Sequence, residues 1–196
     1  MIAHDGSRRD VIVIGGSAGA LPALITILTA LPLDIPAALA VVIHLPALHE
    51  SRLVSVLSRS TDLKVIQAVD TQSFVRGTIY IAPPDRHMRL NAGTIHLDRG
   101  PKQHRTRPAI DPLFVSAAQS YSRAVVGVVL SGASEDGIAG LIAIKAKGGL
   151  ALVQDPAEAP HPRMPLSALQ KDHVDGVLSA INIGETLTQL AKRSAA

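Results

Sequence analysis

The chain has 196 residues, and 47% of them are hydrophobic, which is enough to bury the core of a single α/β domain over 1–196. It contains no cysteine, which excludes disulfides, thiol catalysis and thiolate metal sites, while a net charge of +3 and few aromatic residues argue against a nucleic-acid platform. Apolar runs are too short to span a bilayer, and 1–10, expected to be a flexible N-terminal segment, lacks the apolar centre of a signal peptide. We therefore expect a cytoplasmic protein without direct membrane insertion.

Apolar runs rich in valine and isoleucine alternate along the chain with stretches of helical periodicity. The runs predict strands at 11–14, 38–43, 64–68, 78–82, 124–130 and 150–153. Apolar residues at three- and four-residue spacing predict helices at 21–31, 51–60, 112–122, 138–146 and 183–192. This alternation predicts an α/β fold with a doubly wound, mostly parallel sheet, right-handed crossovers and helices on both faces.

Two segments depart from this alternation. Residues 87–97 form two short alternating runs around an Asn-Ala-Gly turn, which predicts an antiparallel hairpin at the edge of the sheet. Residues 100–108 are basic and without periodicity, which is typical of a surface loop.

The first predicted strand ends in a glycine-rich turn, VIVIGGSAGA at 11–20. A dinucleotide fingerprint needs glycine where Ser17 stands and an acid after the second strand, where the chain has His44. No Gly-Lys-Ser/Thr follows the first strand either, which excludes a P-loop. The turn does match the G-x-S-x-G pattern that presents a nucleophilic serine, although such turns also occur as plain close-packing devices. We predict no nucleotide cofactor.

A reactive serine needs a base and a carboxylate nearby. Both types follow other predicted strands: His44 ends the second, and Asp136 lies in the turn after the strand at 124–130. Carboxyl ends of parallel strands share one edge, so the two side chains can meet Ser17 there. Two plainer interpretations remain: His44 merely ends its strand, and Asp136 caps the following helix. A metal site formed by His44, His49 and Glu50 is disfavoured because their spacing fits no regular ligand geometry, and no metal is predicted.

Taken together, these motifs resemble the catalytic domain of the CheB-type protein-glutamate methylesterases of bacterial chemotaxis. The resemblance covers nearly the whole chain, from Val11 to about Leu190. It is carried by the serine turn, His-x-Pro at 44–46, Tyr-Ile-Ala-Pro at 80–83, a basic loop at 105–108 before an Asp-x-Leu-Phe helix at 111–114, Asp-Gly-x-x-Gly at 136–140 and Met-Pro at 164–165.

The resemblance implies a role for each of the three candidate residues. Ser17 would be the nucleophile, His44 the general base and Asp136 the residue that orients His44. The reaction implied is hydrolysis of glutamyl methyl esters on chemoreceptors with release of methanol, and glutamine deamidation is a related activity. The implied partners are cytoplasmic receptor helices, with a receiver or methyltransferase protein as a further candidate.

The chain departs from the family pattern beside the nucleophile. Ala18 and Ala20 stand where the family usually has threonine and glycine, and Ala133 stands where it has methionine. We expect backbone N–H groups around Ala18 and Gly19 to hold the oxyanion, and Ala133 and Met164 to line the site. Only 1–10 precede the first predicted strand, whereas typical members carry a receiver domain there, which indicates a free-standing relative or an excised domain.

The basic loop has a solvated surface as its plain interpretation and receptor docking as its functional one. We predict that Arg105 and Arg107 contact an acidic receptor helix, with Arg107 the preferred contact from the resemblance. The remaining histidines at 87, 96, 104, 161 and 173 are assigned to surfaces or strand ends. Two other functions stay open: a small-ester or amide hydrolase with the same three residues, and a catalytically weak module that binds receptors or a signalling partner.

Overall fold

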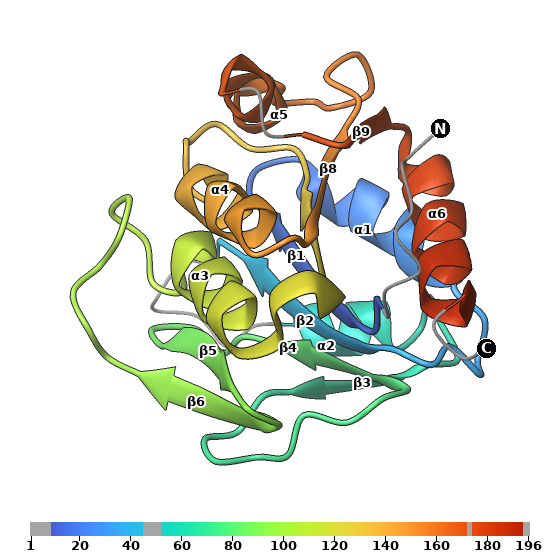
Figure 1. Cartoon of the computed structure of the whole chain (residues 1–196), viewed down its shortest axis with the longest axis vertical. Coiled ribbons are helices and arrows are strands. Elements are labelled where there is room, and N and C mark those ends of the chain that lie inside the picture. The colour runs from blue at the N-terminus through green and yellow to red at the C-terminus, as the bar shows by residue number, and fades with distance from the viewer. Residues whose placement is uncertain (1–8, 45–51, 172–173, 194–196) are drawn as a thin grey trace.

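The computed structural model describes residues 9–44, 52–171 and 174–193, and it is built around one parallel sheet of seven strands (Figure 1). The strand order is β3-β4-β2-β1-β7-β8-β9. The strands are β1 (Val11–Gly16), β2 (Ala38–Ile43), β3 (Lys64–Gln67), β4 (Thr78–Ile81), β7 (Val125–Val129), β8 (Leu150–Gln154) and β9 (Gly176–Leu178). Every pairing within this sheet is parallel.

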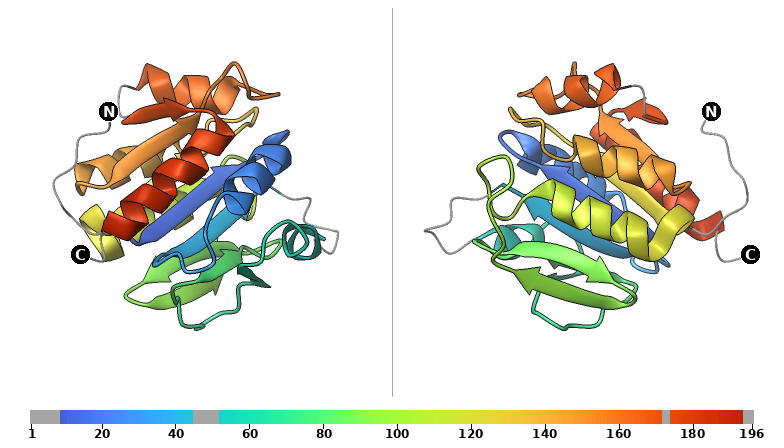
Figure 2. Two further views of the ribbon diagram at one scale, coloured as in Figure 1. Left: turned by 90° about the vertical axis from the view of Figure 1, so that its right-hand side faces the viewer. Right: turned by 60° about the vertical axis from the view of Figure 1, so that its left-hand side comes forward.

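Helices cover both faces of the sheet, as Figure 2 shows. The helices are α1 (Ala20–Thr29), α2 (Leu53–Leu57), α3 (Ile110–Tyr121), α4 (Ile138–Ala146), α5 (Arg163–Gln170) and α6 (Ala180–Arg193), with a 3₁₀ turn at Ser122–Ala124. Residues of α1, α2 and α6 form one core cluster with alternate strand residues, and residues of α3, α4 and α5 form the other. Because β1, β2 and β7 are buried along their whole length, they read as continuous apolar runs. The predicted doubly wound α/β fold is confirmed.

The strand order reverses next to β1. The chain passes from β1 to β2 on one side of it, and β7 later pairs with β1 on the other side. The loops that leave the carboxyl ends of β1 and β7 therefore run to opposite sides, and such a switch point opens a crevice where ligands bind in α/β sheets. Ser17 follows β1 and Asp136 follows β7, so two of the predicted site residues lie at this point.

The predicted hairpin forms, but it does not extend the edge of the large sheet. β5 (His87–Asn91) and β6 (Thr94–Asp98) make a separate two-stranded sheet, and β6 also bonds through Thr94 and Ile95 to the segment at 71–73. This sheet packs on α3, where the Leu90 N–H donates to Ser116 Oγ at 3.0 Å and Ser120 Oγ donates to the Leu90 carbonyl at 3.0 Å. The backbone of β5 thus bonds to helix hydroxyls in place of a sheet strand.

The structure adds two elements that the sequence patterns do not predict, α5 and β9. Pro165 lies in the first turn of α5, where a proline costs no helical hydrogen bond but makes the sequence resemble a loop. The predicted helix at 51–60 is shorter, at Leu53–Leu57, and Ser51 lies outside the described residues.

The start of the chain is described only from residue 9. Arg9, expected within the flexible N-terminal segment, is buried and donates to the carbonyls of Arg123 and Gly148, while 1–8 lie outside the described residues. No helix in the described ranges is long and apolar enough to cross a membrane.

Candidate active site

Ser17 is held at the end of β1 by its own backbone. Its N–H donates to the Ser131 carbonyl at 2.9 Å, and its carbonyl accepts the N–H of Ala20, the first residue of α1, at 3.1 Å. Gly19 has φ of 75°, a left-handed conformation that glycine adopts without strain, and this lets the chain turn directly into the helix. The Ser17 side chain is left half-buried at the start of α1.

His44 connects Ser17 to Asp136. Its N–H donates to the Gly16 carbonyl at 3.1 Å, and its side chain is 9% exposed. Nδ1 lies 3.2 Å from Ser17 Oγ, and Nε2 lies 2.8 Å from Asp136 Oδ2. Because ionised Asp136 can only accept, Nε2 carries the proton and Nδ1 is free to accept from the serine hydroxyl. The two ring nitrogens are thus used in the opposite order to that of chymotrypsin.

Asp136 is fully buried and each of its oxygens accepts hydrogen bonds. Oδ2 accepts the Ile110 N–H at 2.7 Å and Oδ1 accepts the Asp111 N–H at 3.0 Å, in addition to the bond from His44. Asp136 therefore does cap a helix, but the helix is α3 and not α4, which follows it in the chain. Burial acts to raise the pKa of Asp136, but the bonds from His44 and these two N–H groups outweigh it and leave the pKa below its usual value.

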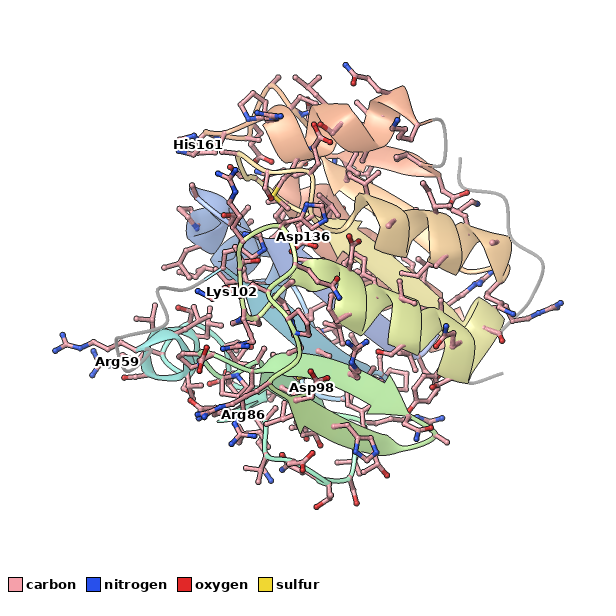
Figure 3. The ribbon with its side chains drawn as sticks, turned by 90° about the vertical axis from the view of Figure 1, so that its left-hand side faces the viewer. Arg59, Arg86, Asp98, Lys102, Asp136 and His161 are labelled. Atoms are coloured by element: carbon pink, nitrogen blue, oxygen red, sulfur yellow. The ribbon has the colours of Figure 1, made fainter. Side chains whose placement is uncertain are left out.

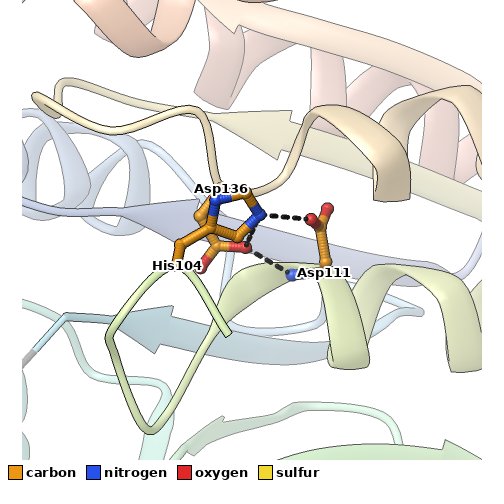
Figure 4. A group of neighbouring side chains, drawn as sticks. All are labelled: His104, Asp111 and Asp136. Carbon is orange, nitrogen blue, oxygen red and sulfur yellow. Dashed lines mark hydrogen bonds and ion pairs between the residues drawn. The ribbon is translucent and has the colours of Figure 1, made fainter. Parts of the chain in front are cut away.

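Asp111 makes the reciprocal bond, since its Oδ1 accepts the N–H of Gly140 in α4 at 2.8 Å. His104 reaches both acids from the basic loop: its Nε2 lies 3.1 Å from Asp111 Oδ2 and 3.9 Å from Asp136 Oδ1 (Figure 4). Burial, and next to it the charge of Asp136, keeps the pKa of Asp111 above its usual value despite the Gly140 and His104 bonds.

The donor set of His104, Asp111 and Asp136 has ligand atoms within 4.8 Å of one another, which raises the question of a metal ion. Both carboxylates already accept N–H groups from the starts of α3 and α4. A helix start carries positive partial charge, so this position favours the two carboxylates themselves over an added cation. We assign no metal to this cluster, and the disfavoured set of His49 and Glu50 with His44 lies partly outside the described residues.

The loop between β6 and α3 lies against this cluster and is fixed at its base. The Arg107 guanidinium donates to Asp85 at 2.6 and 2.9 Å and to the carbonyls of Arg99 and Gly100. Buried His87 ties the two ends of the loop, with Nε2 3.0 Å from the Pro101 carbonyl and Nδ1 accepting the Ala109 N–H at 3.2 Å. The guanidinium of Arg107, the preferred docking contact, is thus engaged by Asp85 and by two carbonyls of its own loop, whereas Arg105 is exposed.

The same loop brings one further hydroxyl to the site. Thr106 Oγ1 donates to the Gln103 carbonyl at 3.0 Å and lies 3.4 Å from His44 Nε2, where it is a weak second acceptor beside Asp136. Figure 3 shows Lys102 of this loop, Asp136 and His161 at the same end of the sheet. Neither Thr106 nor His104 carried a sequence signal for this role, because their partners come from distant strands and turns.

Met164 and Ala133 flank the serine turn. Gly132 separates Met164 from Ser17 so closely that a Cβ there would lie 1.8 Å from Met164 Sδ and 3.0 Å from Ser17 Cβ. Met164 is fully buried, whereas Ala133 is exposed and lines a cavity of about 420 Å³ together with Glu135, His161 and Leu166. Of the other histidines, His96 is half-buried, His161 is exposed and His173 lies outside the described residues.

A serine, a histidine and a buried aspartate joined in series at the carboxyl edge of a parallel sheet form the kind of site that serine hydrolases use. The comparison with known families narrows this class. The family model described as CheB methylesterase matches residues 12–187, and the chain belongs to that family.

Named relatives are similar in sequence to this chain over most of its length. A protein of Leptospira interrogans named "Putative protein-glutamate methylesterase/protein-glutamine glutaminase" is 37% identical over 182 residues, which are 92% of this chain and 94% of the relative. A protein-glutamate methylesterase/protein-glutamine glutaminase of Anaeromyxobacter dehalogenans is 37% identical over 186 residues, but these are 54% of its length.

A solved structure agrees with these relatives. The crystal structure of the Thermotoga maritima CheB methylesterase catalytic domain superimposes with a TM-score of 0.89 at 34% identity, covering 92% of this chain and 98% of that one. At this identity and coverage the fold of the whole described core is that of a CheB catalytic domain.

Proposed function

We propose that this chain is a serine hydrolase that demethylates glutamyl methyl esters on the cytoplasmic helices of chemoreceptors and also deamidates glutamine. The observation that carries the proposal is the unbroken series Ser17 Oγ, His44 and Asp136, at 3.2 and 2.8 Å, in a chain of the CheB methylesterase family. The activity is the one in the names of the Leptospira and Anaeromyxobacter relatives. On this proposal the chain acts in the cytoplasm and needs no cofactor.

The reaction begins when His44 Nδ1 takes the proton of the Ser17 hydroxyl as Oγ attacks the ester carbonyl. Asp136 holds the Nε2 proton and stabilises the imidazolium that forms. As the tetrahedral intermediate collapses, the C–O bond to the methoxy group breaks, and the proton on Nδ1 goes to the leaving methanol. Water, deprotonated by the same nitrogen, then cleaves the acyl-enzyme, releases glutamate and returns the proton to Ser17.

The oxyanion needs hydrogen-bond donors that are free in the resting site. In the described part of the chain, the N–H groups of Ala18 and Gly19 have no hydrogen-bond acceptor, whereas the Ser17 N–H is bonded to Ser131. Both free groups lie at the start of α1, where the helix dipole favours negative charge. These two N–H groups, and not that of Ser17, are the proposed oxyanion donors.

Substrate docking is proposed for the exposed part of the basic loop. Lys102 and Arg105 are exposed, so they suit an acidic receptor helix. The charge of Lys102 also helps to lower the pKa of Asp85. Arg107 contributes to docking indirectly, because its bonds to Asp85 hold the docking loop in place. A receiver or methyltransferase protein stays a further proposed partner.

The test is methanol release from methyl-labelled chemoreceptor membranes by the wild type and by Ser17→Ala and His44→Ala. We expect release by the wild type and its loss in both variants, with ammonia release from glutamine-bearing receptors following the same pattern. His96→Ala is the matched control, because His96 also lies near an aspartate, Asp70, but it belongs to β6 and not to the serine turn. Wild-type protein that binds receptors without releasing methanol would refute the proposal and favour a binding module. Release only from small esters would favour a small-ester hydrolase.

A further inference from the structure

Ser131, which has no role in the mechanism above, makes hydrogen bonds to the turn that carries Ser17. It lies two residues after Val129, the last residue of β7, and has no exposed surface. Two of its atoms make three hydrogen bonds to other parts of the site: its carbonyl accepts the Ser17 N–H at 2.9 Å, its Oγ donates to the Ala18 carbonyl at 2.8 Å, and the same Oγ accepts the His161 N–H at 3.0 Å.

Ser131 is itself fixed by a buried glutamine. The Ser131 N–H donates to Oε1 of Gln154, which is 1% exposed at the end of β8. Gln154 Nε2 in turn lies 3.4 Å from Glu158 Oε2, and that oxygen accepts the N–H of Ala180 at the start of α6. The turn at Ser17 is thereby connected through Ser131 to β8, to Glu158 in the loop after it and to the start of α6, none of which carries a reacting group.

The bond from Ser131 Oγ determines the direction of one peptide. In a trans peptide the carbonyl and the N–H point in opposite directions. When the Ala18 carbonyl is held toward Ser131, the Gly19 N–H of the same peptide is held away from it and has no acceptor in the described structure. The Ser131 carbonyl likewise accepts the Ser17 N–H. Ser131 therefore keeps the Ser17 N–H bonded and leaves the Gly19 N–H without an acceptor in the described structure.

The side chain next to Ser17 offers no alternative way to fix this peptide. Ala18 is exposed and has no hydroxyl or other polar atom. Packing adds to the constraint, because a Cβ at Gly19 would lie 2.9 Å from Ser131 Oγ, so the turn rests directly on that hydroxyl.

We propose that Ser131 is a positioning residue for the reaction, which holds the Ala18–Gly19 peptide so that its N–H faces the oxyanion. The inference rests on the proposed function. Loss of one oxyanion donor lowers kcat by about 10²- to 10³-fold in serine proteases, and a displaced donor is a partial loss. Ser131→Ala should therefore lower kcat by about 10- to 100-fold, with KM within about twofold of the wild type.

The experiment compares kcat and KM of the wild type, Ser131→Ala, Ser131→Thr, Ser120→Ala and Ser17→Ala on methylated receptors and on a small chromogenic ester. Ser131→Ala should lose kcat on both substrates alike, because the oxyanion is common to them, and Ser131→Thr, which keeps the hydroxyl, should retain most of it. Ser120→Ala is the matched control: it also deletes a serine hydroxyl bonded to a carbonyl, that of Leu90, but at the far end of α3. Thermal unfolding of each variant ensures that all rates come from folded protein, and Ser131→Cys replaces Ser131→Ala if the latter does not fold.

The outcomes separate this inference from the proposed function. If Ser131→Ala matches Ser120→Ala in kcat, or changes only KM, or if Ser131→Thr is as impaired as Ser131→Ala, the inference is wrong while the proposed function stands. If the wild type is no more active than Ser17→Ala on either substrate, the proposed function is wrong and the inference falls with it.

Discussion

Two turns of the same kind lie side by side at the edge of the sheet, one after β1 and one after β7. Each ends in a glycine with positive φ immediately before a helix, Gly19 at 75° before α1 and Gly137 at 94° before α4. The first turn leaves Ser17 half-buried beside unengaged N–H groups, whereas the second buries Asp136 among N–H groups that it accepts. The same arrangement of strand, turn and helix can thus present either a half-buried hydroxyl or a buried and oriented carboxylate.

The two turns differ in whether N–H groups at a nearby helix start are already bonded to a carboxylate. Asp136 accepts from α3, a helix of another part of the chain, and Asp111 of α3 returns a bond to α4. The first turn of α1 contains no acidic residue. The Ser17 turn is held by its hydrogen bond to the Ser131 carbonyl instead. The N–H groups that Asp136 accepts help to hold its carboxylate ionised, whereas N–H groups that are left free are available for a charge that forms during reaction.

The largest expected effect is on kcat, when the negative charge of the second turn is removed by Asp136→Asn. Asp136→Asn keeps the size of the side chain, but an amide cannot accept from both Ile110 and His44 at one end and from Asp111 at the other without losing a bond. We expect kcat to fall by about 10⁴-fold, the size of the equivalent loss in a serine protease. Steady-state kinetics on methylated receptors measures it, with Asp70→Asn beside His96 as the control. A loss below about tenfold would show that Asp136 only supports the fold.

The next effect compares the two glycines. Alanine at Gly19 would place a Cβ 2.9 Å from both Pro160 Cβ and Ser131 Oγ, whereas at Gly137 the nearest atom is Ile110 Cγ2 at 3.0 Å. Both variants adopt an unfavourable φ, so each should lose about 1 to 2 kcal/mol of stability, with the larger loss at Gly19. Urea unfolding measures the difference. Gly77→Ala, also at positive φ but with open space around it, isolates the backbone strain; equal losses at all three sites would mean that the close contacts do not matter.

The sequence predicts that Ser17, His44 and Asp136 meet, because parallel strands bring their carboxyl ends to one edge of the sheet. This prediction does not depend on the loops and helices elsewhere in the chain. It does not predict His104, Asp111 or Ser131, whose roles depend on which side chain stands opposite them after folding. His104 looked like a surface residue, and 39% of its side chain is exposed even though it bonds to Asp111. Arg107 looked like a free cation because its partner, Asp85, lies in a different loop.

The two buried acids should respond to pH in opposite ways. The pKa of Asp136 is lowered in the fold, so its stabilising contribution is present above pH 3.8, the ordinary value, and is lost as pH falls below it through the folded pKa. The pKa of Asp111 is raised, so its contribution is present below pH 3.8 and is lost as pH rises through its folded pKa. Urea unfolding between pH 3 and pH 7 of the wild type, Asp136→Asn and Asp111→Asn measures both. The stability advantage of the wild type over Asp136→Asn should grow with pH and that over Asp111→Asn should shrink; parallel curves would contradict the assignment.

The smallest expected effect concerns the loop that lies beside both turns, where two arginines have different surroundings. Arg105 is exposed, so Arg105→Ala should raise KM for receptors by about two- to fivefold, and this increase should shrink at high salt because exposed charges are screened. Arg107→Ala removes the bonds to Asp85 and to two carbonyls, so the loop that carries Thr106 and His104 loses its anchor. Its effect should fall on kcat, should persist in high salt and should appear equally with a small ester. If instead Arg107→Ala changes only KM for receptors and salt abolishes the change, Arg107 is a docking contact and the loop is held without it.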